Sequence, residues 1–403
     1  MKKTVSFLLC IILCITLSVS TTAKTVSMEY EAQDLNTPLE ATTTSATVGQ
    51  TLDIKAKSAI LLEPHTGKIL YEANADEQLP PASITKIMSL LLVMEAIDAG
   101  NLTLETQISA SEHACSMGGS QIWLEPNETM TVDELLKAAV IASANDATVA
   151  LGEAVSGSEE GFVARMNERA KELGMNNTTF INCTGLDAQG HLTTAHDVAL
   201  MSAALIKHEL IKKYSTVWMD TLRGGESELV NTNKLVRFYQ GTTGLKTGTT
   251  SGAGYCLSAT AKRNGMELVA VIMGGDTSND RFNGAKKLLD FGFANFSFTT
   301  VSAEIPENTT VPIRGGVEKC VRVQAGASLQ LLLEKSVSGK VTQELTLSDV
   351  LEAPVKKGDK VGSVKVMIDG KEAGIIEVTA AQDVGRLNFI YCLGRLLSAL
   401  FTL

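Results

Sequence analysis

The spacing of apolar positions changes along the first three quarters of the chain. Short apolar runs at 59–62 and 68–71 flank a Pro-His-Thr-Gly turn signal, and this pattern predicts a β-hairpin. Three later stretches, at 84–92, 131–140 and 194–205, have apolar residues every three to four positions and predict helices, with Gly- and Asn-rich loops between them. Capping patterns at Thr131 and Thr194 indicate two of the helix starts.

Strand-like runs then return at 244–249, 255–261 and 266–273. Glycine-rich turns separate them, including an Asn-Gly pair that is typical of hairpins. A last apolar helix is expected at 281–291. The order of hairpin, helices, strands and helix predicts an α+β fold, in which one antiparallel sheet is covered by helices. We place this domain at 52–297.

Two further segments follow this domain. Residues 298–380 alternate between apolar and polar positions and predict a small all-β domain, which carries no group of chemically active residues and is interpreted as a spacer or docking module. In 381–403 the apolar side chains share one face of a helix. They are Phe389, Ile390, Leu393, Leu396, Leu397, Leu400, Phe401 and Leu403. We expect this helix to lie in a membrane interface as a peripheral anchor. Docking onto the body of the protein is the alternative.

The amino terminus has the layout of a secretory signal. Two lysines precede an apolar run at 5–19, and small residues lead to Ala23, which predicts a signal peptide at 1–23. The run is short for a spanning helix, which needs about 20 residues, so a retained anchor is the less favoured alternative. Residues 24–51 are polar and predict a flexible leader. We therefore expect an exported protein, at the outer face of the cytoplasmic membrane or in the cell-wall space.

Composition and charge exclude several classes of protein. The 403 residues carry a formal charge of −10, with 35 Lys and Arg against 45 Asp and Glu, so a nucleic-acid partner is not expected. The seven cysteines are scattered and form no C-x-x-C pattern. His191 and His196 stand near Asp187 and Asp197, but turn and cap signals surround them. We predict neither a metal nor a cofactor.

Ser83 and Lys86 form the first chemically informative pair. They lie at the start of the first predicted helix, where a spacing of three residues places the hydroxyl and the amine on one face. A serine is a weak nucleophile until a base takes its proton. A neutral Lys86 could be that base if burial or a neighbouring cation lowered its pKa from about 10.4.

Two more motifs fall in suitable places. Ser143-Ala144-Asn145 lies in a break between predicted helices, where the serine could relay a proton and the amide could hold a substrate carbonyl. Residues 246–248 (Lys-Thr-Gly) lie on a predicted strand, supplying a cation, a hydroxyl and an unobstructed backbone. The spacing of Gly-Leu-Lys-Thr-Gly excludes a P-loop. Taken in order, the three motifs resemble the signature of penicilloyl-serine transferases.

The resemblance extends to the low-molecular-mass penicillin-binding proteins, the serine D-alanyl-D-alanine carboxypeptidases. It covers about residues 52–380 and includes 81–86, 144–147, 184–187, 190–195, 244–248 and 288–293. The β-rich domain and the amphipathic tail are similar to that family's layout as well. The resemblance implies that the enzyme removes the terminal D-alanine from peptidoglycan stem pentapeptides through an acyl-serine intermediate. It also implies that β-lactams acylate the same serine.

The resemblance implies a role for each matching residue. Ser83 would be the nucleophile, Lys86 the base, and Ser143 with Lys246 the proton relay. Asn145 would orient the substrate amide, and Thr247 with Thr249 would bind its carboxylate or carbonyl. The backbone N–H groups of Ser83 and Thr249 would form the oxyanion hole, Gly248 would leave the strand open to the substrate, and Arg281 would help to hold the carboxylate.

One position departs from the family pattern. The residue after Lys-Thr-Gly is often His or aromatic in relatives and is Thr249 here, which leaves the deacylation rate and substrate preference open. Two alternatives also stay open. A class A-like β-lactamase is disfavoured by the β-rich domain, the tail and the lack of a clear Glu-x-x-x-Asn loop. A catalytically weak wall-binding or scaffolding protein is favoured only by Thr249 and the unexplained β-rich domain.

Overall fold

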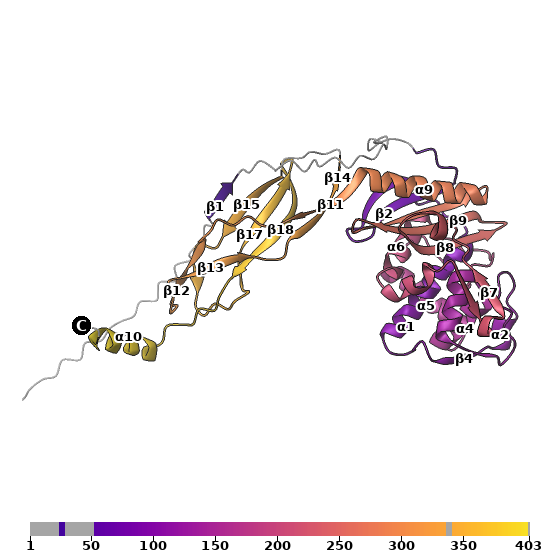
Figure 1. The fold of residues 1–403 in the computed structure, drawn as a ribbon, viewed down its shortest axis with the longest axis horizontal. Coiled ribbons are helices and arrows are strands. Elements are labelled where there is room, and N and C mark those ends of the chain that lie inside the picture. Colours follow the sequence, from indigo (N-terminus) through magenta and orange to yellow (C-terminus); the bar gives the residue numbers. More distant parts are fainter. Residues whose placement is uncertain (1–23, 29–51, 336–340, 402–403) are drawn as a thin grey trace, which may run out of the picture. The chain divides into compact units, whose positions relative to one another are not determined.

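The computed structural model describes residues 24–28, 52–335 and 341–401, which form two compact units (Figure 1). The helix-rich unit extends to Phe298 and also includes Leu332–Ser336. The β-rich unit contains the remaining described residues. This arrangement confirms the predicted fold class: an antiparallel sheet with helices, followed by a separate β-rich domain.

A five-stranded antiparallel sheet forms the centre of the helix-rich unit, in the order β3-β2-β10-β9-β8. Its strands are β2 (Ser58–Glu63), β3 (Lys68–Ala73), β8 (Thr242–Thr250), β9 (Gly254–Arg263) and β10 (Met266–Gly275). The hairpin expected at 59–71 and the later strands are therefore confirmed. Within this sheet β8 pairs only with β9, so β8 is an edge strand.

Alternating side chains of the central strand β10 fill two separate cores. Leu268 and Ile272 pack with the helix α9 (Ser278–Asn295) on one face of the sheet. Val269 and Val271 pack with the other helices on the opposite face. Because successive side chains of a strand point to opposite faces, an apolar run in this strand requires cover on both sides. Figure 1 shows α9 over one face and α1, α4, α5 and α6 beyond the other.

The first predicted helix is expected to be amphipathic, but most of it is buried on all sides. In α1 (Lys86–Asp98) the residues from Lys86 to Met94 are all buried. The helix is surrounded, because it packs against α4, α5, α6 and β8. A helix buried on every side needs no polar face, and this explains why its only early polar groups are Lys86 and Ser89.

Short elements complete the helix-rich unit. The helices are α2 (Glu112–Cys115), α3 (Val132–Lys137), α4 (Asn145–Ser156), α5 (Glu159–Glu172), α6 (Ala195–Leu205), α7 (Lys212–Ser215) and α8 (Leu235–Phe238). Single turns are η1 (Ala82–Thr85), η2 (Ala138–Ala142), η3 (Glu209–Ile211) and η4 (Arg223–Gly225). Two small hairpins pair β4 (Gln107–Ser109) with β5 (Thr129–Thr131), and β6 (Met219–Leu222) with β7 (Ser227–Val230). The capping box at Thr131 and the cap at Thr194 are confirmed.

The β-rich unit is built around a seven-stranded sheet in the order β1-β15-β17-β18-β13-β12-β16. Its strands are β1 (Lys24–Met28), β12 (Thr310–Arg314), β13 (Cys320–Ala325), β15 (Val341–Leu347), β16 (Leu351–Glu352), β17 (Lys360–Ile368) and β18 (Lys371–Ala380). Two further strands, β11 (Phe296–Val301) and β14 (Leu329–Glu334), pair with each other. Valines from β12, β13, β17 and β18 are buried, which gives this unit an apolar core.

Part of the predicted leader is a strand. Residues Lys24–Met28 pair antiparallel with β15, whereas the sequence predicted no regular structure there. The edge of β15 offers unpaired backbone groups, and a short run with β-branched residues can satisfy them although it has no strong apolar period. The predicted signal at 1–23 and the rest of the leader at 29–51 lie outside the described residues.

The tail forms the predicted helix, α10 (Phe389–Phe401). Several of its apolar side chains are solvent-exposed: Phe389 and Ile390 by about 80% each, and Leu396 and Leu400 by 63%. Among the described residues, no helix is long and apolar enough to cross a membrane.

Candidate active site

Ser83 lies on η1, immediately before α1, and two glycines pack against its turn. A Cβ atom added to Gly185 would lie 1.8 Å from the carbonyl oxygen of Ala82. A Cβ atom added to Gly248 would lie 2.9 Å from the carbonyl oxygen of Pro81 and 3.0 Å from the amide nitrogen of Ser83. The turn is therefore held between two backbones that only glycine allows this close. Gly185 also needs glycine for its φ of +88°.

Lys86 is completely buried and contacts the Ser83 hydroxyl. Its Nζ atom donates hydrogen bonds to Ser83 Oγ at 3.0 Å, to Asn145 Oδ1 at 2.5 Å and to the carbonyl oxygen of Thr184 at 2.7 Å. Burial lowers the pKa of Lys86 to about 7, because desolvation penalises the charged form, and the negative charge of Asp146 only partly opposes this. Near neutral pH a large fraction of Lys86 is therefore neutral and can accept a proton.

Ser143 and Asn145 lie where the helix around α3 and η2 ends and α4 begins. Ser143 is buried and has a left-handed backbone, with φ of +64°. This conformation ends η2 and lets α4 begin at Asn145. The Asn145 side chain donates to the carbonyl oxygen of Gly118 at 2.6 Å, while its Oδ1 accepts from Lys86. Asn145 thus connects the lysine to the loop that precedes β5.

The edge strand β8 presents different residues to its two sides. Gly248 faces the turn that carries Ser83, whereas the hydroxyl of the next residue, Thr249, accepts a hydrogen bond from Arg281 on α9 at 2.8 Å. Thr247 donates a hydrogen bond to the Thr232 hydroxyl at 2.7 Å. Lys246 is buried, and its pKa is well below the usual value because of desolvation and the nearby charges of Lys86 and Arg281.

Arg281 is a buried cation that the sheet and α9 enclose. Besides Thr249, its guanidinium donates to the carbonyl oxygens of Gly248 at 3.1 Å and Cys256 at 3.4 Å. Its Nε atom is buried without a hydrogen-bond partner, and no carboxylate pairs with Arg281 among the described residues. Desolvation lowers its pKa. A buried guanidinium without a counter-ion attracts an anionic group that can reach it.

Several groups that form the site could not be predicted from sequence patterns. The Thr184 carbonyl that accepts from Lys86 is a backbone atom, so side-chain patterns cannot reveal it. The motifs suggest no role for Asp146, yet its buried carboxylate accepts from the backbone N–H groups of Ile122 and Leu124, each at 3.1 Å. It therefore fixes the loop beside Asn145.

His191 stabilises the turn that carries Ser83, because it contacts Thr85 of the same turn. Its Nδ1 accepts from the backbone N–H of Ile181 at 3.3 Å, so its Nε2 carries the proton and donates to the Thr85 hydroxyl at 2.9 Å. Desolvation lowers its pKa to about 4, which keeps the ring neutral. His196 instead lies 3.6 Å from Asp76, so the two histidines have different partners.

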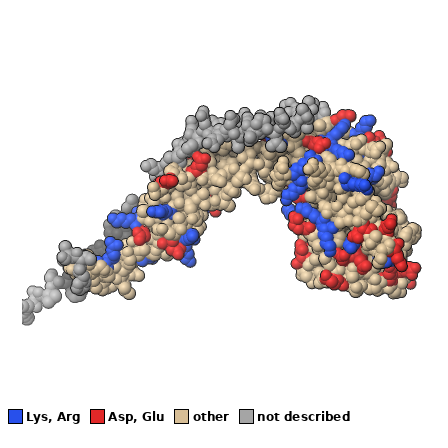
Figure 2. Space-filling view, in the orientation of Figure 1, with Lys and Arg blue, Asp and Glu red and all other residues tan. Residues whose placement is uncertain are grey.

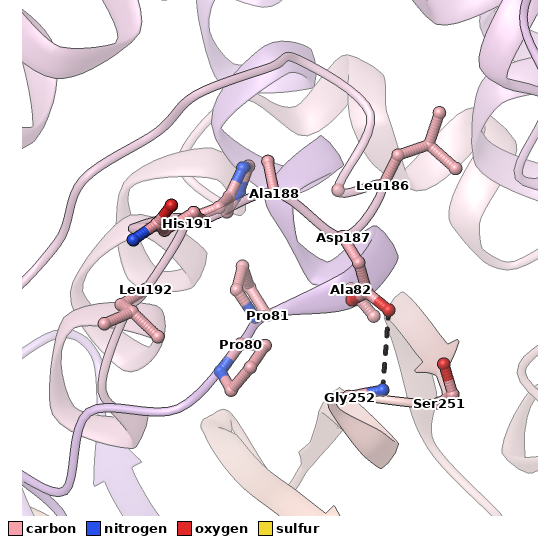
Figure 3. Close-up of a pocket in the computed structure, with 12 residues that line it drawn as sticks. Pro80, Pro81, Ala82, Leu186, Asp187, Ala188, His191, Leu192, Ser251 and Gly252 are labelled. Carbon is pink, nitrogen blue, oxygen red and sulfur yellow. Dashed lines mark hydrogen bonds between the residues drawn. The ribbon is translucent and has the colours of Figure 1, made fainter.

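A pocket of about 390 Å³ adjoins the turn that carries Ser83 (Figure 3). One wall is 80–82 and another is the loop that contains Leu186, Asp187 and His191. Asp187 accepts hydrogen bonds from the Thr250 hydroxyl at 2.7 Å and from the N–H of Gly252 at 3.4 Å. These bonds fasten the loop to the turn between β8 and β9, as Figure 3 shows for Gly252.

Ser83 lies beside the buried Lys86, next to the edge strand β8 and the buried Arg281. This arrangement is typical of a serine acyl-transfer enzyme. The comparisons specify this class. The family model described as D-alanyl-D-alanine carboxypeptidase matches residues 41–277, and the model described as penicillin-binding protein 5, C-terminal domain, matches residues 297–386. The chain therefore belongs to the serine D-alanyl-D-alanine carboxypeptidase family of penicillin-binding proteins.

Individual proteins agree with this assignment. D-alanyl-D-alanine carboxypeptidase DacF of Bacillus subtilis (strain 168) is 43% identical over 345 residues, covering 85% of this chain and 89% of the relative. DacC of Escherichia coli (strain K12) is 37% identical over 328 residues, covering 79% and 81%. The structure of penicillin binding protein 5 from Haemophilus influenzae has a TM-score of 0.70 at 30% identity, covering 84% of this chain and 99% of that one. These similarities favour neither the β-lactamase nor the scaffold alternative.

Proposed function

We propose that Ser83 is the nucleophile that removes the terminal D-alanine from peptidoglycan stem pentapeptides, with Lys86 as its base. The observation that carries this proposal is the 3.0 Å hydrogen bond between Lys86 Nζ and Ser83 Oγ, combined with a lysine pKa of about 7. A base is most effective when its pKa lies near the operating pH. Ser83 is only partly buried, so a substrate can reach it.

The bonding changes can be followed through the site. The Ser83 Oγ atom attacks the penultimate D-alanine carbonyl, and its proton passes to Lys86. The carbon–nitrogen bond then breaks, and the leaving D-alanine amine takes the proton through a relay made of Ser143 and Lys246. Water hydrolyses the acyl-serine ester and restores Ser83. The strongly lowered pKa of Lys246 supports its part in a proton relay.

The edge strand β8 would orient the substrate peptide. An extended peptide can pair with the free edge of β8. The closeness of Gly248 to Ser83 supports an oxyanion hole made by the backbone N–H groups of Ser83 and Thr249. Arg281, through Thr249, would hold the terminal carboxylate, and Asn145 would orient the amide that precedes the penultimate D-alanine. β-Lactams would acylate Ser83 at the same place.

The test uses the full purified chain and the peptide diacetyl-Lys-D-Ala-D-Ala. Free D-alanine is measured, and acylation of Ser83 is followed by intact mass. We expect release that is lost in Ser83→Ala. Rapid penicillin turnover without D-alanine release would instead support the β-lactamase. If neither activity occurs although ligand still binds, the scaffold alternative holds.

We also propose export and peripheral membrane attachment through α10, with 52–297 as the catalytic domain and 298–380 as a spacer. The exposure of Phe389 and Ile390 supports insertion of this helix into a lipid interface. Cleavage after Ala23 would leave β1 in the mature chain. Vesicle flotation tests the anchor: we expect the full chain to float and a chain ending at residue 386 not to float. Equal behaviour of the two chains would contradict it.

A further inference from the structure

Trp123 has an unusual backbone for an aromatic residue. Its φ is +58°, a left-handed conformation that is disfavoured for a bulky side chain. Its side chain is 75% exposed, although Ile122 and Leu124 on either side are buried. Such strained residues persist only where the surroundings enforce them, and they cluster at ligand-binding sites.

Charged side chains on both sides enforce this conformation. The buried Asp146 carboxylate accepts from the N–H groups of Ile122 and Leu124. From the other side Arg223 donates to the carbonyl oxygens of Ile122 at 2.9 Å and Trp123 at 3.4 Å. Arg223 is itself held by Glu128 through two hydrogen bonds, of 2.8 and 3.0 Å. The backbone of Trp123 is therefore held from both sides, and its indole is largely exposed to solvent.

The same loop touches the candidate active site. Asn145 donates from its side chain to the Gly118 carbonyl and from its backbone N–H to the Ser120 carbonyl, at 2.6 and 2.7 Å. Trp123 follows Ser120 by three residues, so their Cα atoms are at most about 11 Å apart. The loop that carries Trp123 is thus tied to the site at Asn145, and the exposed indole belongs to this loop.

We propose that Trp123 is a specificity residue that binds the side chain of the amino acid preceding D-Ala-D-Ala, and that it favours a long side chain ending in an ammonium group. The inference rests on the proposed function, because Asn145 would there hold the amide that joins this amino acid to the penultimate D-alanine. The residue on the amino-terminal side of that amide would then extend over the loop that carries Trp123.

The charge around the loop favours a cation. Glu125 is exposed two residues after Trp123. Acidic side chains also gather over the end of the unit that carries α2 and β4, whereas Lys and Arg side chains gather toward α9 (Figure 2). An indole face attracts an ammonium ion, and it also packs against the methylene groups of a lysine-like chain.

Two peptides and two variants separate this role from a structural one. The full chain is assayed with Nα-acetyl-Lys-D-Ala-D-Ala and with the norleucine peptide of the same shape, which lacks the ammonium. We expect kcat/KM to favour the lysine peptide by about fivefold. The preference should persist in Trp123→Phe, which keeps a π-face, and disappear in Trp123→Leu, which keeps only apolar bulk. Phe238→Ala, which removes an aromatic residue that is 62% exposed elsewhere, should keep the preference.

An unchanged preference in Trp123→Leu, or no preference in the wild type, would overturn the proposal. Acylation by 6-aminopenicillanic acid, which has no acyl side chain, reports whether each variant has folded. Failure of the proposed function is recognised separately, as absence of both D-alanine release and Ser83 acylation. In that case the double variant Ser83→Ala with Trp218→Phe leaves Trp123 as the single tryptophan. Its fluorescence should respond to the lysine peptide at lower concentration than to the norleucine peptide, and equal responses would overturn the contact.

Discussion

Arg281 donates a 2.8 Å hydrogen bond to the hydroxyl of Thr249, which joins α9 to the end of the edge strand. The position of Thr249 is the one at which the sequence departs from its family pattern, and the contact gives the threonine a physical role. A hydroxyl that accepts from a buried guanidinium fixes the direction of the remaining N–H groups. Because no carboxylate pairs with Arg281 among the described residues, these groups can serve an anionic ligand.

We predict that Arg281→Gln lowers kcat/KM for diacetyl-Lys-D-Ala-D-Ala by about 10- to 100-fold, because a charge-assisted hydrogen bond contributes about 1.5–3 kcal/mol. The same peptide with an amidated carboxyl terminus should lose little further activity. Arg237→Gln, at an exposed arginine on α8, serves as the control and should leave both rates near those of the wild type. Equal losses for the free and amidated peptides would show that Arg281 acts on the fold and does not bind the carboxylate.

Lys86 should make acylation depend on pH. Its pKa is about 7, and only the neutral amine can take the Ser83 proton. The second-order rate of acylation by benzylpenicillin should therefore rise about tenfold per pH unit below pH 6 and level off above pH 8. Stopped samples between pH 5 and 9, measured by intact mass, give the profile. A rate that does not change between pH 6 and 8 would exclude Lys86 as the titrating base.

Gly185→Ala should disrupt the turn that carries Ser83. The new Cβ atom would meet the Ala82 carbonyl oxygen at 1.8 Å, and backbone atoms cannot move aside cheaply. We expect a loss of more than about 4 kcal/mol in the free energy of unfolding, or loss of acylation in whatever protein still folds. Gly67→Ala is the matched control. It also has a positive φ, +73°, but open space around it, so it should cost only about 1 kcal/mol. Similar thermal unfolding of the two variants would contradict the close approach.

The parts of the fold that follow from local periodicity could be predicted from the sequence. The apolar run of β10 indicates a strand, and the three-residue spacing of Ser83 and Lys86 places both groups on one face of a helix start. The burial of α1 on every side from Lys86 to Met94 could not be predicted, because it depends on which elements pack around the helix. The same applies to β1, whose pairing with β15 is set by an open sheet edge more than 300 residues away.

Some residues of the candidate site could likewise be predicted from the sequence, and others could not. Side chains with distinct chemistry, such as Lys246 and Arg281, could be selected from motifs. The Thr184 carbonyl and the close packing of Gly185 could not, because they act through the backbone and through the absence of a side chain. Gly248 was expected to leave room for substrate, whereas the structure shows that it also lets β8 approach Ser83. Such contacts between distant segments require coordinates.

His191 should make the stability of the helix-rich unit depend on pH. Its pKa is about 4 in the folded protein and about 6.5 in the unfolded chain, so the folded state binds fewer protons between these values. Stability is then fully present above pH 6.5 and falls as the pH drops toward 4, by about 3 kcal/mol in total. We expect the denaturation midpoint in urea to fall less between pH 7 and 4.5 in His191→Gln than in the wild type. His196→Gln, at a half-buried histidine beside Asp76, should follow the wild type, and identical pH dependence in all three proteins would show that His191 is not the group responsible.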